Sequence, residues 1–155
     1  MINLNKNIAT FNNFTVKFDS EILCYAEMKD RVIFLVNWFT LQHYAREGNN
    51  IGQIIEGDEQ DENIFCYSTK TGKMLWQIDH KNPQGEVIKD VFVGMGFGLN
   101  EKTKNEKWHN TDFDKKITIP NFNLSKDTIK VGTMKGHHYK LDPLTGKIEY
   151  LYFGK

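Results

Sequence analysis

Two segments of the chain repeat nearly the same phrase, and this repetition limits the fold more than any other feature. Residues 63–78 and 137–152 align without a gap; the first contains CYSTKTGKMLW, the second contains KLDPLTGKIEY, and Thr-Gly-Lys falls at the same place in both. Each copy consists of an alternating apolar run, a turn and a second apolar run, which is typical of half-buried strands. Two similar β-hairpins are therefore predicted.

The residues of the shared turn have the properties that a tight connection needs. Gly72 and Gly146 stand where the backbone is expected to need positive φ, a conformation that glycine adopts without steric cost. Asp142 can accept hydrogen bonds from backbone amides two or three residues further on, and Ser68 is its weaker counterpart in the first copy. Pro143 presets the first torsion of the second turn.

Further alternating runs precede each hairpin. They cover residues 22–27 and 31–38 before the first copy, and residues 87–93, 116–119 and 128–134 before the second. We therefore predict a mainly β protein with two antiparallel, blade-like meander sheets in one domain over residues 1–155. The blade-like halves lie at about 20–79 and 86–154, and the segment from Phe39 to Arg46 is the only plausible helix.

The repeated phrase resembles the blade motif of quinoprotein-type β-propellers, the pyrroloquinoline-quinone-like repeats. The matching residues are Asp142, Thr145, Gly146 and Lys147 in one copy, and Thr71, Gly72, Lys73, Leu75 and Trp76 in the other. Ser68 replaces the Asp of the motif in the first copy, and Tyr150 replaces its Trp in the second. The resemblance implies hairpin geometry and no quinone site, and two blades are too few for a closed propeller of about four to eight. The alternative is that one favourable turn arose twice.

Composition excludes several classes of protein. No segment of the 155 residues is long and apolar enough to span a bilayer, and the N-terminal MINLNKNIATF lacks the basic start and apolar stretch of a signal peptide. We therefore expect a cytoplasmic protein with no membrane partner. Cys24 and Cys66 lie in predicted strands, where buried reduced thiols are expected.

Charge is unevenly distributed along a chain whose net charge is zero. Residues 1–62 contain five Lys/Arg against ten Asp/Glu and residues 63–155 contain fifteen against ten, so the two parts carry −5 and +5. Such a separation can steer a charged partner and fix its orientation. The alternative is that the opposite charges of the two parts meet and cancel.

The most acidic stretch is EGDEQDE, with five carboxylates in residues 56–62. It ends the segment 39–62, which interrupts the first meander, and long insertions in compact domains tend to be functional or disordered. Its spacing lacks the ligand pattern of a calcium-binding loop. We expect these carboxylates to imitate phosphates and occupy a basic cleft, beside two apolar anchors; the predicted partner-binding residues are Glu56, Asp58, Glu59, Asp61, Glu62, Tyr44 and Trp38.

Other reactive groups form no recognisable catalytic or metal site. His43 and Arg46 have no nucleophile or second acid spaced to join them, and His137 and His138 should point to opposite faces of a strand. The run GMGFG at 94–98 lacks the following helix of a phosphate loop, so we interpret it as a flexible or bulged strand end. A basic and aromatic stretch is a candidate surface that competes with the acidic loop, namely Lys102, Lys104, Lys107 and Trp108; the alternative interpretation is a solvated loop.

These observations favour a binding protein over an enzyme. We predict a cytosolic immunity protein, or antitoxin, that neutralises a toxin domain such as a nuclease by covering its active site. The alternatives are a small enzyme or ligand-binding protein with a cleft near His43 and Arg46, and a scaffold protein. We expect no cofactor, and the zero net charge argues against nucleic acid as a direct ligand.

Overall fold

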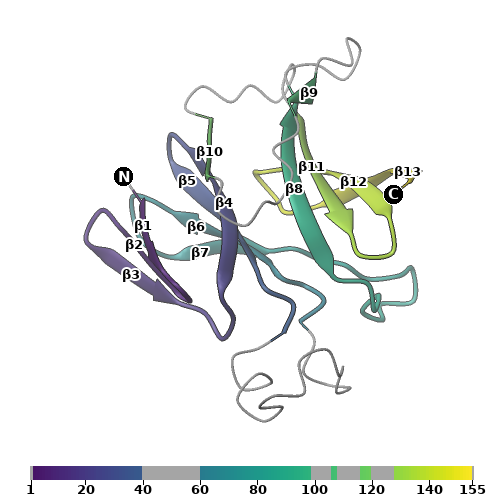
Figure 1. Ribbon diagram of the computed structural model, residues 1–155, viewed down its shortest axis with the longest axis horizontal. Helices are drawn as coiled ribbons and strands as arrows, with labels where there is room; N and C mark the ends of the chain where they lie inside the picture. The colour runs from purple at the N-terminus through teal and green to yellow at the C-terminus, as the bar shows by residue number, and fades with distance from the viewer. Residues whose placement is uncertain (1, 40–59, 99–105, 108–115, 120–127, 155) are drawn as a thin grey trace.

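A computed structural model describes residues 2–39, 60–98, 106–107, 116–119 and 128–154. This part of the chain contains thirteen β-strands and no helix, and the strands form three open sheets that lie side by side (Figure 1). The first has three strands, in the order β1-β2-β3. The second has the order β10-β4-β5-β6-β7, and the third has the order β13-β12-β11-β8-β9.

The N-terminal sheet is a small antiparallel meander of β1 (Ile2–Asn5), β2 (Ile8–Phe11) and β3 (Phe14–Lys17). Asn12 and Asn13 connect β2 to β3 with φ angles of 46° and 67°. Asparagine tolerates this left-handed conformation, and two such residues form the connection that suits the twist of a hairpin. The sequence patterns singled out above did not predict this sheet.

The second sheet contains the first predicted meander. Its strands β4 (Ile22–Met28), β5 (Arg31–Val36), β6 (Ile64–Ser68) and β7 (Met74–Gln77) pair antiparallel with their neighbours along the chain. A further strand, β10 (Lys116–Ile119), pairs with β4 in the parallel sense.

The third sheet contains the second predicted meander, which is formed by β8 (Phe92–Gly98), β11 (Thr128–Thr133), β12 (His137–Leu141) and β13 (Ile148–Phe153). The short strand β9 (Glu106–Lys107) pairs with β8 at one edge. The register shifts between His138 and Tyr139, where β12 faces β13. Because β13 has one extra residue there, its side chains change faces along the strand.

Two strand assignments made from sequence need correction. The strand at 116–119 was expected in the second meander, but it joins the first one as β10, beside β4. A short alternating run identifies a strand without identifying its partner, because any free sheet edge offers the same backbone groups. The strand expected at 87–93 lies later, at Phe92–Gly98, so the glycine-rich run belongs to β8. The register against β11 shifts at Val93, just before the run, which agrees with the bulged alternative of the prediction.

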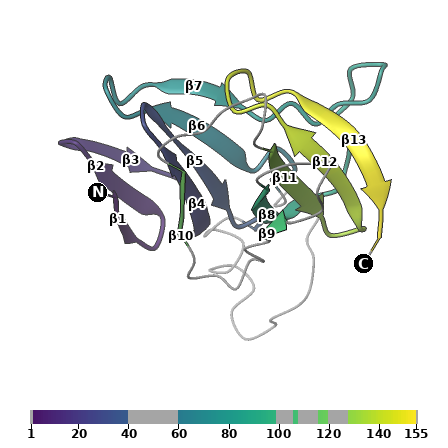
Figure 2. The same cartoon turned by 90° about the horizontal axis from the view of Figure 1, so that it is seen from above.

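Each face of the middle sheet packs against another sheet, as Figure 2 shows from above. In β5, Ile33 and Leu35 belong to the core shared with the third sheet, whereas Val32, Phe34 and Val36 belong to the core shared with the first. Side chains alternate between the two faces of a strand. The unbroken apolar run of β5 therefore supplies two cores at once.

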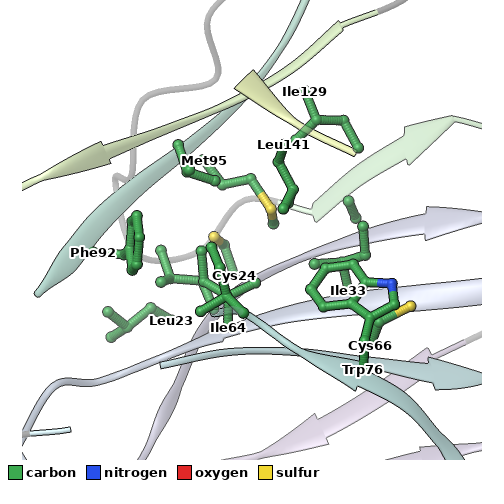
Figure 3. Close-up of a cluster of buried hydrophobic side chains, with 14 of the residues drawn as sticks. Leu23, Cys24, Ile33, Ile64, Cys66, Trp76, Phe92, Met95, Ile129 and Leu141 are labelled. Atoms are coloured by element: carbon green, nitrogen blue, oxygen red, sulfur yellow. The ribbon is translucent and has the colours of Figure 1, made fainter. Parts of the chain in front are cut away.

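The larger core lies between the second and third sheets (Figure 3). It joins residues of β4 to β7 with Phe92, Met95, Ile129, Val131 and Leu141 of the third sheet. Cys24 and Cys66 lie within it as free, buried thiols, as predicted. Burial raises the pKa of each thiol to about 12, which keeps both protonated near neutral pH.

The two repeated turns have the geometry that the sequence predicts. Gly72 and Gly146 have φ angles of 71° and 76°, and their amides donate to the carbonyls of Ser68 and Asp142. The Ser68 hydroxyl accepts from the amides of residues 70 and 71, and the Asp142 carboxylate accepts from the amide of residue 144.

Both turns are also joined to the preceding sheet in the same way. A Cβ atom on Gly72 would lie 2.5 Å from the ring of Phe14 in β3, and one on Gly146 would lie 2.6 Å from the ring of Trp76 in β7. Asn12 Nδ2 donates to the carbonyl of Thr69 at 3.0 Å. At the equivalent place in the second copy, Trp76 Nε1 donates to the carbonyl of Pro143 at 2.9 Å. Each joint thus combines an aromatic ring against a glycine with a hydrogen bond to the turn.

Polar side chains occupy a cross-strand row on each outward face of the three packed sheets, and on the third sheet the ring of Tyr152 lies beside that row. On the first sheet, cross-strand neighbours place Asn3, Thr10 and Thr15 together on the face that points away from the core. On the third sheet, Lys130, Lys140 and Glu149 occupy the corresponding row. Polar outer faces are typical of the terminal units of repeat proteins.

The joint between the second and third sheets can be tested at Gly146. We expect Gly146→Ala to lower the free energy of unfolding by about 2 kcal/mol or more, through positive-φ strain and displacement of the Trp76 ring. Gly85→Ala is the matched control, since Gly85 has a φ of 82° and no atom near an added Cβ. It should cost only about 1 kcal/mol. Urea denaturation measures both values, and equal losses would contradict the packing role of Gly146.

Candidate functional site

The structure describes three of the seven residues predicted to bind a partner. Trp38, Asp61 and Glu62 lie where the segment 40–59 leaves and rejoins the second sheet. The remaining predicted residues lie outside the described part of the chain, namely Tyr44, Glu56, Asp58 and Glu59, together with the alternative pair His43 and Arg46. The expected helix at 39–46 falls there too, apart from Phe39, as do Lys102, Lys104 and Trp108 of the competing surface.

The two ends of the insertion meet in a stem, which we define as residues 36–38 and 60–63. The amide of Gln60 donates to the carbonyl of Trp38 at 2.7 Å, and the amide of Val36 donates to the carbonyl of Asn63 at 3.0 Å. These bonds continue the pairing of β5 with β6. The backbone of the predicted site residue Trp38 is thereby held next to Gln60, which directly precedes the predicted site residue Asp61.

Buried Asn63 fastens this stem to the third sheet. Its Nδ2 donates to the carbonyls of Val36 and Phe92, each at 2.8 Å, and its Oδ1 accepts from the amide of Phe92 at 3.1 Å. All three polar bonds are buried, so losing them would leave unsatisfied backbone groups inside the protein. The start of β8 is thereby held against the end of β5.

Next to this clamp lies a buried acid and histidine cluster that the sequence patterns did not reveal. His80 is fully buried, its ring centroid lies 4.7 Å from that of Phe92, and its Nε2 is 3.3 Å from the Tyr139 hydroxyl. Asp90 is also buried and accepts from the amide of Lys135 at 3.1 Å. Asp61, in the stem, lies near enough for its carboxylate charge to raise the pKa of His80. No spacing links positions 61, 80, 90 and 139, so only the fold brings them together.

Burial controls the protonation of this cluster. It lowers the pKa of His80 and therefore favours the neutral imidazole. The charge of Asp90, a hydrogen bond to the Asp90 backbone and the charge of Asp61 act in the opposite direction and raise this pKa. Burial also raises the pKa of Asp61, although Lys89 and His80 oppose the shift. The pKa of Tyr139 is raised by burial, and then by the charge of Asp90, so its hydroxyl keeps its proton.

The cluster has little direct access to a reactant, because His80 and Asp90 are buried. Within the described residues, no group of three or more His, Cys, Asp or Glu side chains is arranged to hold a metal ion. His137 and His138 point to opposite faces, as predicted, since His137 lies near the Tyr150 hydroxyl and His138 near the carbonyl of Gly154.

A second candidate surface follows the outer edge strands β7 and β13, which lie along one side of the molecule in Figure 2. In the described structure, each pairs with only one neighbour. Exposed apolar side chains line these strands and the turn before β13; this apolar rim consists of Met74, Leu75, Leu144, Tyr150, Tyr152 and Phe153. The sequence IEYLYF could have indicated this surface, because only one of its six residues is charged.

The aromatic part of the rim contains its two most exposed side chains, Phe153 and Tyr150. Tyr150, Tyr152 and Phe153 have 53%, 44% and 61% of their surface accessible, and large exposed rings are unusual in soluble proteins except at interaction sites. His137 lies between two of them, with ring centroids 5.8 Å from Tyr150 and 5.2 Å from Phe153. Tyr150 and Phe153 therefore form one patch with His137.

Comparison with known proteins identified no matching family model, and no curated protein or solved structure with significant similarity. No helix among the described residues has the length and apolar character needed to cross a membrane.

The buried histidine makes stability depend on pH. Since the pKa of His80 is lowered in the folded protein, the unfolded chain takes up a proton first as the pH falls through about 6.5. His80 thus lowers stability on acidification. We expect His80→Gln to reduce the loss of unfolding free energy between about pH 7.5 and about pH 5.5.

The matched control is His138→Gln, which removes an imidazole from the opposite face of the third sheet. It leaves the contribution of His80 in place. Denaturant titrations at both pH values provide the measurement, and an identical pH dependence in wild type and His80→Gln would contradict the assignment.

Proposed function

We propose that this protein is a cytoplasmic immunity protein that binds a toxin domain in a stoichiometric complex. The single observation that best supports protein binding is the exposed aromatic strand β13, at an open sheet edge. Edge strands usually carry charges or prolines that prevent pairing. Of the six residues of β13, only Glu149 is charged, and none is proline.

The chemistry of the rim suits a protein partner. Aromatic side chains supply much of the binding energy in protein interfaces, and the free backbone edge of β13 can pair with an extended strand of the partner. The acidic stem residues Asp61 and Glu62 add negative charge elsewhere, which suits a basic toxin surface.

In the first experiment, the wild-type protein is used to isolate its binding partner from the cells that naturally produce this protein, and the partner is then tested for toxicity. An immunity protein requires a one-to-one partner that stops growth when it is expressed alone and is harmless when both proteins are expressed together. A captured partner without toxicity would reject the immunity proposal while leaving a binding function. The absence of any stoichiometric partner would reject both.

The contribution of the rim is tested with Tyr150→Ser combined with Phe153→Ser. Removal of two exposed rings should weaken binding by roughly tenfold or more, mainly through faster dissociation. Thr10→Ala with Thr15→Ala changes a pair of exposed residues on the opposite end of the stack and should leave affinity unchanged. Surface plasmon resonance gives both rates, and equal affinities for the two double variants would contradict binding through β13.

The acidic insertion makes a different kinetic prediction. Replacing Asp58, Glu59, Asp61 and Glu62 by their amides should slow association and weaken its salt dependence, because charges around an interface act mainly on the encounter rate. Dissociation should change little. An unchanged association rate at low and moderate salt would remove the acidic loop from the mechanism and leave the rim as the binding surface.

A further inference from the structure

The backbone groups of β13 divide into those that face β12 and those that face the open edge of the sheet. At the turn, the amide of Asp142 donates to the carbonyl of Lys147 at 2.9 Å. The Lys147 carbonyl therefore points toward β12, and backbone groups alternate in direction from one residue of a strand to the next. It follows that Ile148 and Tyr150 direct their amide and carbonyl groups away from β12.

The far end of the strand gives the same result beyond the register shift. There the amide of Gly154 donates to the carbonyl of Gly136 at 2.8 Å, so this amide points toward the start of β12. By the same alternation, Phe153 directs its backbone groups to the open edge. Within the described structure, the backbone groups that face outward and lack a neighbouring strand thus belong to Ile148, Tyr150 and Phe153.

Aromatic rings stand on both faces of this open edge. Tyr150 and Phe153 both contact the ring of His137, so they lie on one face of the sheet. Tyr152 lies on the other face, where its ring stacks on that of His138 at a centroid distance of 4.6 Å. All three rings of β13 are exposed. A strand placed beside β13 would therefore have aromatic rings above and below it.

The opposite edges of the second and third sheets show how this fold completes an edge. There β10 pairs with β4 and β9 pairs with β8, so both edges receive a strand from the segment between β8 and β11. Neither β7 nor β13 receives such a strand in the described part of the chain. Because β13 has six residues against four in β7, and carries the three rings, an added strand gains more contact at β13.

A second copy of this chain suits the edge poorly. If β13 paired antiparallel with its own copy so that Ile148 faced Tyr150, the two Glu149 side chains would stand directly opposite each other. Like charges in opposed positions destabilise a strand pair. We infer that the edge of β13 accepts an extended strand of a different polypeptide, which forms backbone hydrogen bonds with Ile148, Tyr150 and Phe153.

The side chains of β13 also define the chemistry of that strand. Because side chains alternate between the faces of a strand, apolar residues at every second position would contact Tyr150 and Phe153. On the other face, a basic residue would lie opposite Glu149, where an opposite-charge pair is favourable. The inference rests on the proposed protein-binding function and adds its mode. Main-chain pairing supplies affinity, and the alternating side chains supply specificity.

Amide hydrogen exchange, followed residue by residue with NMR, tests the edge in the free protein. The amides of Ile148, Tyr150 and Phe153 should exchange at least about tenfold faster than that of Glu149, which faces β12. Equal protection of all four amides would overturn the inference, since the edge would already be covered. Protection that rises with protein concentration would also overturn it, because a second copy would then occupy the edge.

The same measurement on the complex with the isolated partner tests strand pairing itself. Exchange at Ile148, Tyr150 and Phe153 should slow by about tenfold or more. A complex that leaves these amides unprotected would overturn strand addition but not the immunity proposal, since the partner would dock through side chains alone. A harmless partner that protects them would reject the immunity proposal and support strand addition. The absence of any partner would overturn both.

A comparison of Tyr150→Pro with Tyr150→Ser isolates one backbone hydrogen bond. Both variants lose the ring, but only proline also loses the amide that faces the edge. Edge strands tolerate proline where its missing N–H would face outward, so both variants should unfold at similar urea concentrations. The proline variant should bind the partner roughly fivefold more weakly, as expected for one net hydrogen bond.

Equal affinities of the two folded variants would overturn the inference. Should Tyr150→Pro not fold, the exchange rates of the wild-type amides decide the question, since they report the direction of the Tyr150 amide without any substitution.

Discussion

Burial of both faces of the middle sheet is the constraint on which the rest of the structure depends. Strand β5 reads VIFLV over residues 32–36, and all five side chains are buried, in two separate cores. A sheet of this kind cannot be stable with one face in water, because burying each large apolar side chain stabilises the fold by about 1.5–3 kcal/mol. A sheet on either side is thus a requirement of the sequence of β5.

The repeated hairpins hold the three sheets in register. Sheets that pack only through aliphatic contacts can slide, whereas a ring against a glycine allows one position. The Pro143 carbonyl accepts from Trp76 and also from Arg31, which Asp30 orients through paired hydrogen bonds. Arg31 also lowers the pKa of Asp30, which favours the ion pair. The joint therefore fixes the angle between sheets through bonds that apolar packing lacks.

The sequence predicts the local structure well and the long-range structure less well. Both hairpins, their positive-φ glycines and the side chains that accept from turn amides follow from Ser68 to Lys73 and its copy, because these interactions span few residues. The partner of β10 does not follow, since pairing with β4 joins segments about ninety residues apart in the chain. The cluster of His80 and Asp90 is hidden for the same reason. The run VIFLV, in contrast, carried a signal for a third layer, since unbroken apolar strands are buried on both faces.

The two candidate surfaces are connected through the buried cluster. The carboxylate of Asp61 in the stem raises the pKa of His80 through its charge. His80 in turn contacts the Tyr139 hydroxyl, and the Tyr139 ring meets Tyr150 of the rim at 5.5 Å, edge to face. Contact alone does not establish coupling, which needs an element with two arrangements that both sites can bias. His80 is an ionisable group in this path, and because burial lowers its pKa the neutral imidazole is the favoured state. Neutral His80 keeps its contact with Tyr139 in either tautomer, because Nε2 accepts from the hydroxyl in one and donates to it in the other.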